Sequence, residues 1–471
     1  MRPVSVVIIG AGSASFGLNA LATLLREPVL RGSSLALVDT NVEGLQLVRA
    51  LAERMNREWD AGLTITSTPD RVGVLPGADF VVTTIEVGPR EDLWREDWEV
   101  TRRHGLRQPY AENGGPGGFA HAARNIPPIL DIARDMERLC PRALLINLSN
   151  PLPRLCRAVT RYTGIRTLGL CHQIGHGYRM AGLLLADRLG IEVSEELSGA
   201  HIGDDALWPG FERIGLQAEA LIQITAAGLN HFTWMLDVRD RRSGEDLYPE
   251  LRARFLAGPA AFEPLTRDML RLSGVLPVPG DMHLCEYLPF THNAATEPWK
   301  RYDLHLYDWD GRARKREEGW TAIAAMSKAD GPAIDSLREA RSEGMFEAIY
   351  GIAGSANVFR EAFDVTNDGA ITNLPAHVIV ETPGIFGGPG AQPLRVGALP
   401  PVAAELCRRE AECVELAVEA AVTGSRDVAL QALALDPMVD DLDMARAILD
   451  DYLETHRATL PQFHDRWHFE R

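Results

Sequence analysis

Short runs of apolar residues alternate with amphipathic stretches over the first 170 residues of the chain. Each run is continuously hydrophobic and rich in β-branched residues, which is typical of parallel strands covered on both faces. The stretches between the runs carry apolar residues at helical spacing. The expected strands are residues 4–10, 34–39, 79–85, 143–150 and 166–171, and the expected helices are 18–27, 43–59 and 126–140. This alternation predicts an α/β fold with a doubly wound parallel sheet.

The pattern changes beyond about residue 200, where mixed α and β structure is expected. Residues 220–240 predict one or two longer strands, and 261–273, 334–350 and 402–457 have helical spacing. A chain of 471 residues is too long for one typical core, so we expect two packed domains, 1–200 and 201–471. The first would be the Rossmann-like unit, and the second a mixed α+β unit.

Composition and charge disfavour some classes of function and partner. The net charge of −17 disfavours nucleic acid and anionic membranes as partners, but it leaves a neutral small molecule open. We recognise no export signal and no apolar stretch long enough to span a bilayer. The cysteines have neither metal-knuckle nor disulfide-framework spacing (Cys140, Cys156, Cys171, Cys285, Cys407 and Cys413). We therefore expect a cytoplasmic protein with free thiols.

The sequence GAGSASFG follows the first expected strand and opens the first expected helix. Glycines at Gly10, Gly12 and Gly17 would allow a sharp turn and a close approach to a pyrophosphate. The free N–H groups of the helix would face the phosphates, with Ser13 and Phe16 as further contacts. Because Ser15 stands in place of a third glycine, the motif alone is a weak signal.

The second expected strand ends at Asp39, which strengthens the interpretation of a nucleotide site. A carboxylate there can accept hydrogen bonds from ribose hydroxyls and would repel a 2′-phosphate, so NAD is favoured over NADP. The alternative is that Asp39 only caps the following turn. We expect NAD binding because strand, glycine loop, helix, strand and acid occur in the required order.

Polar residues follow the later strands, at the edge where α/β sheets bind ligands. Asn147 and Asn150 end the fourth run, although Asn150 before a proline also suits a simple turn. Cys171 and His172 follow the fifth, and His231 lies in GLNHFTW. Each could be an ordinary buried residue, but cysteine and histidine together suit a borderline divalent metal with open coordination positions.

Two loops add further candidates for substrate contact and acid–base chemistry. ENGGPGGFAHAARNIP carries Glu112 and Asn113, and a run so rich in glycine is expected to approach a ligand. PGDMHLCEYLPF carries Asp281 and His283. The second loop could also be merely a polar loop anchored by Tyr287.

The order of these motifs, from GAGSASFG and VDTN through DFVVTTIEVGP, ENGGPGG, NLSNP and GLCH to GLNHFTW, resembles glycoside hydrolase family 4. DMHLCEYLPF extends the resemblance, and about the last hundred residues are outside it. The resemblance implies hydrolysis by redox and elimination. NAD takes hydride from C3 of the sugar, a base removes the C2 proton, and the glycosidic oxygen leaves. Water then adds at C1 and the hydride returns, with retention, while a divalent metal acts as Lewis acid.

The resemblance also implies roles for individual residues. Cys171 and His231 match the metal ligands, with Mn²⁺ as the expected ion, and Asn150 matches a sugar-binding asparagine. Glu112, Asn113 and His283 are expected substrate contacts, and Asn147 an expected cofactor contact. His172 is a candidate acid, whereas the base would be Asp281 or a tyrosine, for which Tyr287 is the local candidate. Members of the family imply a homodimer or homotetramer.

Departures from the pattern indicate the substrate class. Phosphosugar branches carry Asp or Asn after the metal cysteine, and this chain has His172, so an unphosphorylated, α-linked hexoside or hexuronide is expected. The branch resembled is the α-glucosidase and α-galacturonidase one, and glucoside, galactoside and uronide all stay open. ENGGPGG also replaces a threonine expected near Asn113.

Two other functions remain compatible with the first half of the chain. A 2-hydroxyacid dehydrogenase of lactate or malate type would need an arginine for the substrate carboxylate, for which Arg90, Arg95 and Arg124 are available. It would leave Cys171 and His231 unexplained. A non-catalytic NAD sensor would bind nucleotide without metal or turnover.

Overall fold

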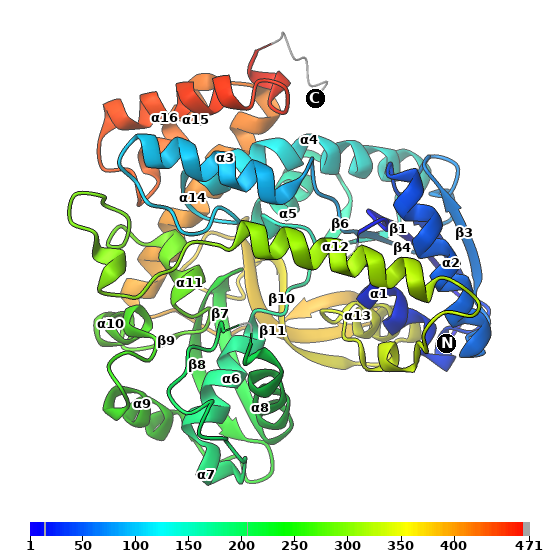
Figure 1. The fold of residues 1–471 in the computed structure, drawn as a ribbon, viewed down its shortest axis with the longest axis horizontal. Coiled ribbons are helices and arrows are strands. Elements are labelled where there is room, and N and C mark those ends of the chain that lie inside the picture. Colours follow the sequence, from blue (N-terminus) through cyan, green and yellow to red (C-terminus); the bar gives the residue numbers. More distant parts are fainter. Residues whose placement is uncertain (14–15, 205, 465–471) are drawn as a thin grey trace.

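The computed structural model describes residues 1–13, 16–204 and 206–464, and a parallel sheet forms its first half (Figure 1). The strands are β1 (Ser5–Ile9), β2 (Ser34–Val38), β3 (Thr64–Thr68), β4 (Phe80–Thr83), β5 (Leu144–Asn147) and β6 (Arg166–Gly169), in the order β3-β2-β1-β4-β5-β6. This is the order of doubly wound dinucleotide-binding domains, so the predicted fold class is confirmed. The sequence pattern missed β3, an edge strand whose polar residues TITST give no apolar run.

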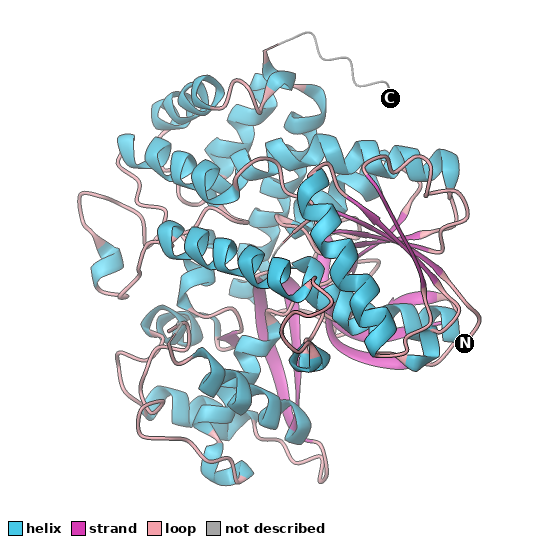
Figure 2. Ribbon diagram, turned by 45° about the vertical axis from the view of Figure 1, so that its right-hand side comes forward, coloured by secondary structure: helices cyan, strands magenta, loops and turns pink. Residues whose placement is uncertain are grey.

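Helices cover both faces of the parallel sheet, and the strand residues alternate between the two cores (Figure 2). Val6 and Ile8 face one core, where α1 (Phe16–Leu25), α2 (Val42–Glu58) and α13 (Met345–Gly354) pack. Val7 and Ile9 face the other, which α4 (Gly115–Leu139) and α5 (Leu152–Tyr162) fill. Because the helices cover the faces, a ligand site is expected at the carboxyl ends of the strands.

An antiparallel part continues the same sheet. It consists of β7 (Ile222–Leu229), β8 (Phe232–Asp240), β9 (Leu276–Pro277), β10 (Val358–Thr366), β11 (Ile379–Gly387) and β12 (Gly390–Pro393). The hairpin of β10 and β11 joins the two parts through single residue pairs, Asp364 with Gly169 and Glu381 with Gly228. The two longer strands expected within 220–240 are β7 and β8, joined by a two-residue turn at Asn230 and His231.

Some of the remaining helices pack against regions that lie far away in sequence. They are α3 (Arg90–Arg103), α6 (Ile174–Leu184), α7 (Ala186–Leu189), α8 (Trp208–Leu221), α9 (Tyr248–Ala257), α10 (Pro264–Ser273), α11 (Asp281–Leu284), α12 (Trp309–Met326), α14 (Pro401–Thr423), α15 (Arg426–Leu435) and α16 (Leu442–Thr455). Helices α14 to α16 add to the core of α4 and α5, and α12 and α13 pack beside α1 and α2. Segments after residue 200 thus complete the first half of the fold, and no break in the sheet marks residue 200 within the described chain.

The glycine-rich segment is more ordered than its composition suggests. Helix α4 already begins at Gly115, so only residues 112–114 form a loop. A Cβ at Gly114 would lie 2.5 Å from the Glu286 carbonyl oxygen, and one at Gly118 would lie 2.5 Å from the Asn113 carbonyl oxygen. These glycines are needed for close packing, which corrects the expectation that the whole run approaches a ligand. Among the described helices, none is both long and apolar enough to cross a bilayer.

Candidate active site

The loop after β1 has the shape that a dinucleotide requires. Gly10 has a φ of +93°, and a Cβ there would lie 2.4 Å from the Thr84 carbonyl oxygen. A Cβ at Gly12 would lie 2.8 Å from Cγ of Asp39. Both positions therefore need glycine, and the bare backbone leaves a cradle at the carboxyl end of the first strand.

Asp39 closes this loop from the end of β2. Its Oδ2 accepts the N–H of Gly12 at 2.7 Å, and its Oδ1 accepts the N–H of Asn41 at 2.7 Å. The carboxylate therefore caps the next turn and also holds the glycine loop, while partial exposure leaves it open to a ribose. Ser13 lies in the loop, Phe16 and Gly17 begin α1, and Ser15 is outside the described residues. The contacts of these residues with NAD stay predictions.

Asn147 supports the strand end and does not present its amide at the surface. It is fully buried, its Oδ1 accepts from Thr83 Oγ1 at 2.9 Å, and its Nδ2 donates to the Ser149 carbonyl at 2.9 Å. The contact of Asn147 with the cofactor stays a prediction. Asn150 lies beyond it, and its Nδ2 donates to Glu112 Oε1 at 2.7 Å. That bond joins the loop after β5 to the loop before α4.

Cys171 and His231 meet although 60 residues separate them in sequence. Cys171 follows β6, and His231 lies in the β7–β8 turn with a φ of +58°, a left-handed conformation that is uncommon outside glycine. The Sγ of Cys171 lies 3.2 Å from Nε2 of His231. Two ligands at 90–110° around a zinc-like ion are about 3.1 to 3.6 Å apart. The donor atoms therefore fit two neighbouring positions around one divalent cation.

The protein around this pair suits a cation. Burial, followed by the charges of His283 and His172, holds the pKa of His231 well below its usual value, so the imidazole is neutral as a ligand must be. Burial, with Glu343 and Glu381 nearby, raises the pKa of the Cys171 thiol. A bound divalent cation reverses that preference, because it stabilises the thiolate directly.

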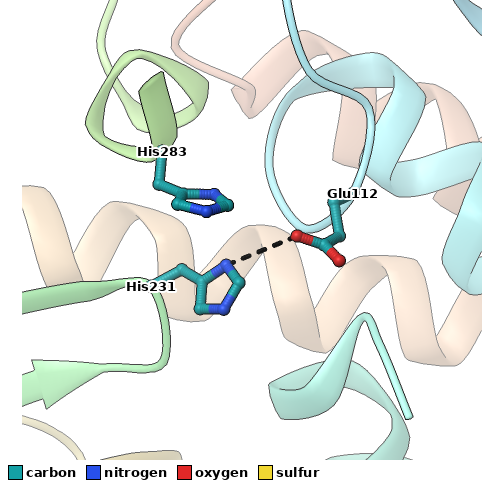
Figure 3. Close-up of side chains that lie close together, drawn as sticks. All are labelled: Glu112, His231 and His283. Atoms are coloured by element: carbon teal, nitrogen blue, oxygen red, sulfur yellow. Dashed lines mark ion pairs between the residues drawn. The ribbon is translucent and has the colours of Figure 1, made fainter. Parts of the chain in front are cut away.

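A second group of possible ligands surrounds the opposite side of the same imidazole (Figure 3). Glu112, His231 and His283 each offer an atom within 4.8 Å of the others. Oε2 of Glu112 lies 3.6 Å from Nδ1 of His231, and the rings of His231 and His283 are 4.4 Å apart. Burial raises the pKa of the Glu112 carboxyl. Nδ1 is also approached by Asn113, whose Nδ2 lies 3.0 Å away.

His172 points away from this cluster toward an acid that the sequence did not indicate. Its Nδ1 lies 2.7 Å from Oε1 of Glu343, which precedes α13. The surrounding protein disfavours the imidazolium, but the hydrogen bond and charge of Glu343 outweigh it and raise the pKa of His172. The side chain is 64% exposed, so we assign the shift to Glu343. An exposed imidazole with a carboxylate behind it can give or take a proton.

The two expected bases, Asp281 and Tyr287, have contacts with the surrounding fold. The carboxylate of Asp281 accepts the N–H groups of Leu265 and Thr266 at 2.8 and 2.7 Å, so it caps the start of α10. Tyr287 is buried against Phe232, with ring centroids 4.6 Å apart. Both side chains are thus tied into the fold, and their role as base stays a prediction.

The arginines required by a 2-hydroxyacid dehydrogenase also have structural contacts. Arg124 is buried and makes two bonds to Asp97, at 2.9 and 2.6 Å. Arg95 pairs with Asp310 at the surface. Arg90 is only partly exposed and lies over the ring of Trp94.

Three supporting residues carried no signal in the sequence. Glu343 contacts His172, and His121 Nδ1 lies 2.7 Å from the carbonyl oxygen of Glu112. Glu381 accepts from Asn230 Nδ2 at 2.7 Å, next to His231. Glu343 and Glu381 reach the site from distant segments, whereas His121 lies nine residues after Glu112.

Comparison with known proteins decides the family. Residues 5–185 match family 4 glycosyl hydrolase, and residues 226–439 match the family 4 glycosyl hydrolase C-terminal domain. The chain belongs to glycosyl hydrolase family 4. It is thus a glycosidase, and the resemblance inferred from the motifs is confirmed.

Relatives within family 4 cover nearly the whole chain. An α-galactosidase of Bacillus subtilis is 31% identical over 97% of this chain and 99% of its own length. An α-glucosidase of Erwinia rhapontici is 29% identical over 92% and 93%. The solved 6-phospho-α-glucosidase from gut microorganisms, in complex with NAD and Mn²⁺, has a TM-score of 0.78 at 22% identity and covers 98% of this chain and 99% of that one. This likeness confirms the fold.

Proposed function

We propose that this family 4 enzyme cleaves an unphosphorylated, α-linked hexoside or hexuronide, with retention, using NAD and a divalent metal, Mn²⁺. The observation that carries the proposal is the 3.2 Å approach of the Cys171 thiol to His231 at the carboxyl edge of a doubly wound sheet. The glycine cradle at the end of β1 supplies the matching nucleotide site. A relative in this fold is recorded with NAD and Mn²⁺ together.

Bound NAD would exchange hydride with C3 of the sugar, and the ion would stabilise negative charge on the O2 and O3 side. The chain's own residues hold and orient these groups. Cys171 and His231 bind the ion, and Gly10, Gly12 and Asp39 receive the nucleotide. Asn150 and Glu112, already joined at 2.7 Å, present an amide and a carboxylate to sugar hydroxyls.

We assign the proton transfers to His172 and to the titratable groups beside His231. His172, backed by Glu343 at 2.7 Å, is the proposed acid for the leaving oxygen. The base for the C2 proton comes from Glu112 or His283, the two titratable groups beside His231 in Figure 3. A carboxyl with a raised pKa, as Glu112 has, is a stronger base than an ordinary one.

The charges around the site favour a sugar without phosphate. The carboxylates of Glu112, beside His231, and of Glu343, beside His172, would repel a doubly charged phosphate. Relatives named for unphosphorylated α-glycosides, an α-galactosidase and an α-glucosidase, support the same choice. We further propose a cytoplasmic homodimer or homotetramer whose partner is a small glycoside, with neither nucleic acid nor membrane as a partner.

The test is product release from a panel of aryl and natural α- and β-glycosides, including uronides and 6-phosphosugars. Each substrate is incubated with NAD and Mn²⁺ under reducing conditions, and again with either component omitted. Release that needs both components, without net NADH, supports the proposal and identifies the sugar. Accumulation of NADH without cleavage would indicate a dehydrogenase, and binding of NAD without turnover would indicate a sensor.

Solvent deuterium locates the base. In D₂O, the product of wild-type enzyme should carry deuterium at C2, because the removed proton exchanges before it returns. Glu112→Gln and His283→Gln are compared with Asp281→Asn. The variant that lacks the base should lose C2 exchange and turnover together while still binding NAD. If only Asp281→Asn loses exchange without loss of folding, the reassignment of the base is wrong.

A further inference from the structure

Asn113 lies directly behind the imidazole of His231. It is 3% exposed, and its Nδ2 lies 3.0 Å from Nδ1 of His231. Its Oδ1 is buried and has no hydrogen-bond partner among the described residues. The side chain therefore contacts His231, and the sugar contact expected from the sequence stays a prediction.

The two nitrogens of His231 face different partners, so its tautomer matters. Nε2 faces the Cys171 thiol at 3.2 Å, while Nδ1 faces the amide of Asn113. A neutral imidazole carries one N–H and one lone pair. If Nδ1 accepts from the Asn113 NH₂ group, Nε2 carries the hydrogen and cannot bind a metal together with Cys171. If Oδ1 occupies that position, it accepts Nδ1–H and the lone pair of Nε2 faces Cys171.

The two ends of the Asn113 amide have the same shape, so the chemistry of the site decides between them. Histidines that ligate a metal commonly donate their other ring N–H to an oxygen, which fixes the tautomer. Turning the amide by 180° places the unpaired Oδ1 on Nδ1. The competing acceptor is Oε2 of Glu112, but at 3.6 Å it is beyond hydrogen-bond length.

The loop that carries Asn113 is held firmly in this position. The backbone N–H groups of Asn113 and Gly114 both donate to Oε2 of Glu286, at 2.9 and 3.0 Å, and Glu286 is fully buried. On the other side, His121 contacts the carbonyl oxygen of Glu112 at 2.7 Å. The amide of Asn113 is thereby fixed against the ring, as a positioning residue requires.

Asn113 also decides between the two groups of possible ligands. An ion bound by Glu112, His283 and Nδ1 of His231 would occupy the space in which Asn113 lies 3.0 Å from Nδ1. An ion bound by Cys171 and Nε2 leaves Asn113 in place. We propose that Asn113 is a positioning residue that accepts Nδ1–H of His231, so that Nε2 and the Cys171 thiolate together bind the divalent cation. This inference rests on the metal site of the proposed function.

The test compares Asn113→Leu, which has a similar shape but no acceptor, with Asn113→Asp, which keeps one. Mn²⁺ alone is titrated into the full chain under reducing conditions, and free Mn²⁺ is measured by electron paramagnetic resonance. Loss of an outer hydrogen bond to a metal ligand weakens binding by about 10- to 100-fold. Asn113→Leu should show that loss, and Asn113→Asp should bind at least as tightly as wild type.

The tautomer is measured without metal or turnover. In protein labelled with ¹⁵N-histidine, the wild-type signal of His231, assigned with His231→Gln, should show the proton on Nδ1. Asn113→Asp should keep this signal, and Asn113→Leu should lose the preference. Thermal unfolding of both variants shows whether each is folded. Equal Mn²⁺ affinity in Asn113→Leu and wild type, equal weakening in both variants, or an unfolded Asn113→Asp would overturn the proposal.

Variants of the ligands separate this inference from the proposed function. If Cys171→Ser abolishes Mn²⁺ binding while Asn113→Leu leaves it unchanged, only the role of Asn113 fails. If Cys171→Ser binds as wild type but Glu112→Gln and His283→Ala do not, the ion lies on the Nδ1 side, and the positioning role is wrong. If the wild-type chain neither binds Mn²⁺ nor cleaves any glycoside, both the inference and the proposed function fail.

Discussion

At the scale of single residues, the nucleotide loop depends on the absence of a side chain at Gly10. This residue combines a φ of +93° with a backbone oxygen 2.4 Å from any Cβ placed there. A left-handed conformation costs an ordinary residue roughly 1–2 kcal/mol, and the collision adds to that. Since the obstructing atom belongs to the backbone of Thr84, relief requires a shift of the strand end.

We therefore expect Gly10→Ala to weaken NAD binding at least tenfold and to lower the melting temperature. Gly77→Ala is the matched control, because Gly77 has a φ of +80° and a Cβ there would meet no described atom within 4 Å. The control should show the strain alone and bind NAD normally. Calorimetric titration with NAD measures the difference, and equal behaviour of the two variants would show that the close approach is unimportant.

A second effect at the residue scale concerns pH. Glu410 is buried in α14, and burial raises the pKa of its carboxyl to about 8, although Arg154 contacts it at 3.2 Å. The folded state holds this proton more tightly than the unfolded chain, whose pKa is near 4.5. The contribution is fully present below that value and is lost as pH rises through about 8.

Glu410→Gln cannot ionise, so its melting temperature should fall less than that of wild type between pH 5 and pH 9. The control is Glu405→Gln on the same helix, because Glu405 is 72% exposed and should leave the pH profile unchanged. Thermal unfolding across the pH range measures both. Parallel curves for wild type and Glu410→Gln would mean that Glu410 is already ionised in the fold.

At the scale of elements, one buried acid joins three helices. Asp97 of α3 is fully buried, bonds twice to Arg124 of α4, and lies 2.7 Å from Nε2 of His456 at the end of α16. The hydroxyl of Tyr452 in α16 also donates to the Asp97 carbonyl at 3.2 Å. The last helix is therefore attached to α4, the helix that begins at the active-site loop.

Removing one partner of such a pair leaves a buried charge. We expect Arg124→Met to reduce the free energy of unfolding by about 3–5 kcal/mol, because Asp97 then has only His456 to balance it. Arg102→Met on the exposed side of α3 removes a surface pair with Glu99 and should change stability by less than about 1 kcal/mol. Urea unfolding measures both variants. Equal losses in the free energy of unfolding would show that the buried pair stabilises the fold no more than the surface pair.

The elements also show what the sequence alone can predict. Continuous apolar runs predicted β1, β2, β4, β5 and β6, because buried parallel strands need no polar face. The pattern does not predict the strand Thr64–Thr68, because an edge strand can be polar and then has no apolar run. The glycine run before α4 was misjudged because glycine composition does not distinguish a mobile loop from a tightly packed helix start.

The same limit applies to the site. Motif order placed Cys171 and His231 as candidates, and the fold brings them to 3.2 Å. The sequence does not show which groups a given carboxylate contacts in the fold. Asp281 looks like a base in sequence, yet it caps α10, while Glu343 has no motif and reaches His172 from a loop 171 residues away. Roles set by distant contacts require the structure.

At the scale of the whole molecule, one sheet passes through both halves of the chain (Figure 2). Helices α12 to α16, from the second half, complete cores on both faces of the first. The cores on both faces of the parallel sheet therefore contain residues from both halves of the chain. We therefore expect one cooperative calorimetric transition, raised as a whole by NAD. Two separate transitions, only one of them shifted by NAD, would show instead that the halves are independent domains.

The central claim is that this family 4 glycosidase needs both NAD and a metal held by Cys171 and His231. The most direct measurement is glycoside cleavage by chelator-treated, NAD-free enzyme, with Mn²⁺ and NAD restored singly and together, for wild type and Cys171→Ser. The account predicts cleavage by wild type only when both are present, without accumulating NADH, and a rate at least 100-fold lower for Cys171→Ser. Cleavage by wild type without NAD or without metal, or unchanged activity of Cys171→Ser, would contradict it.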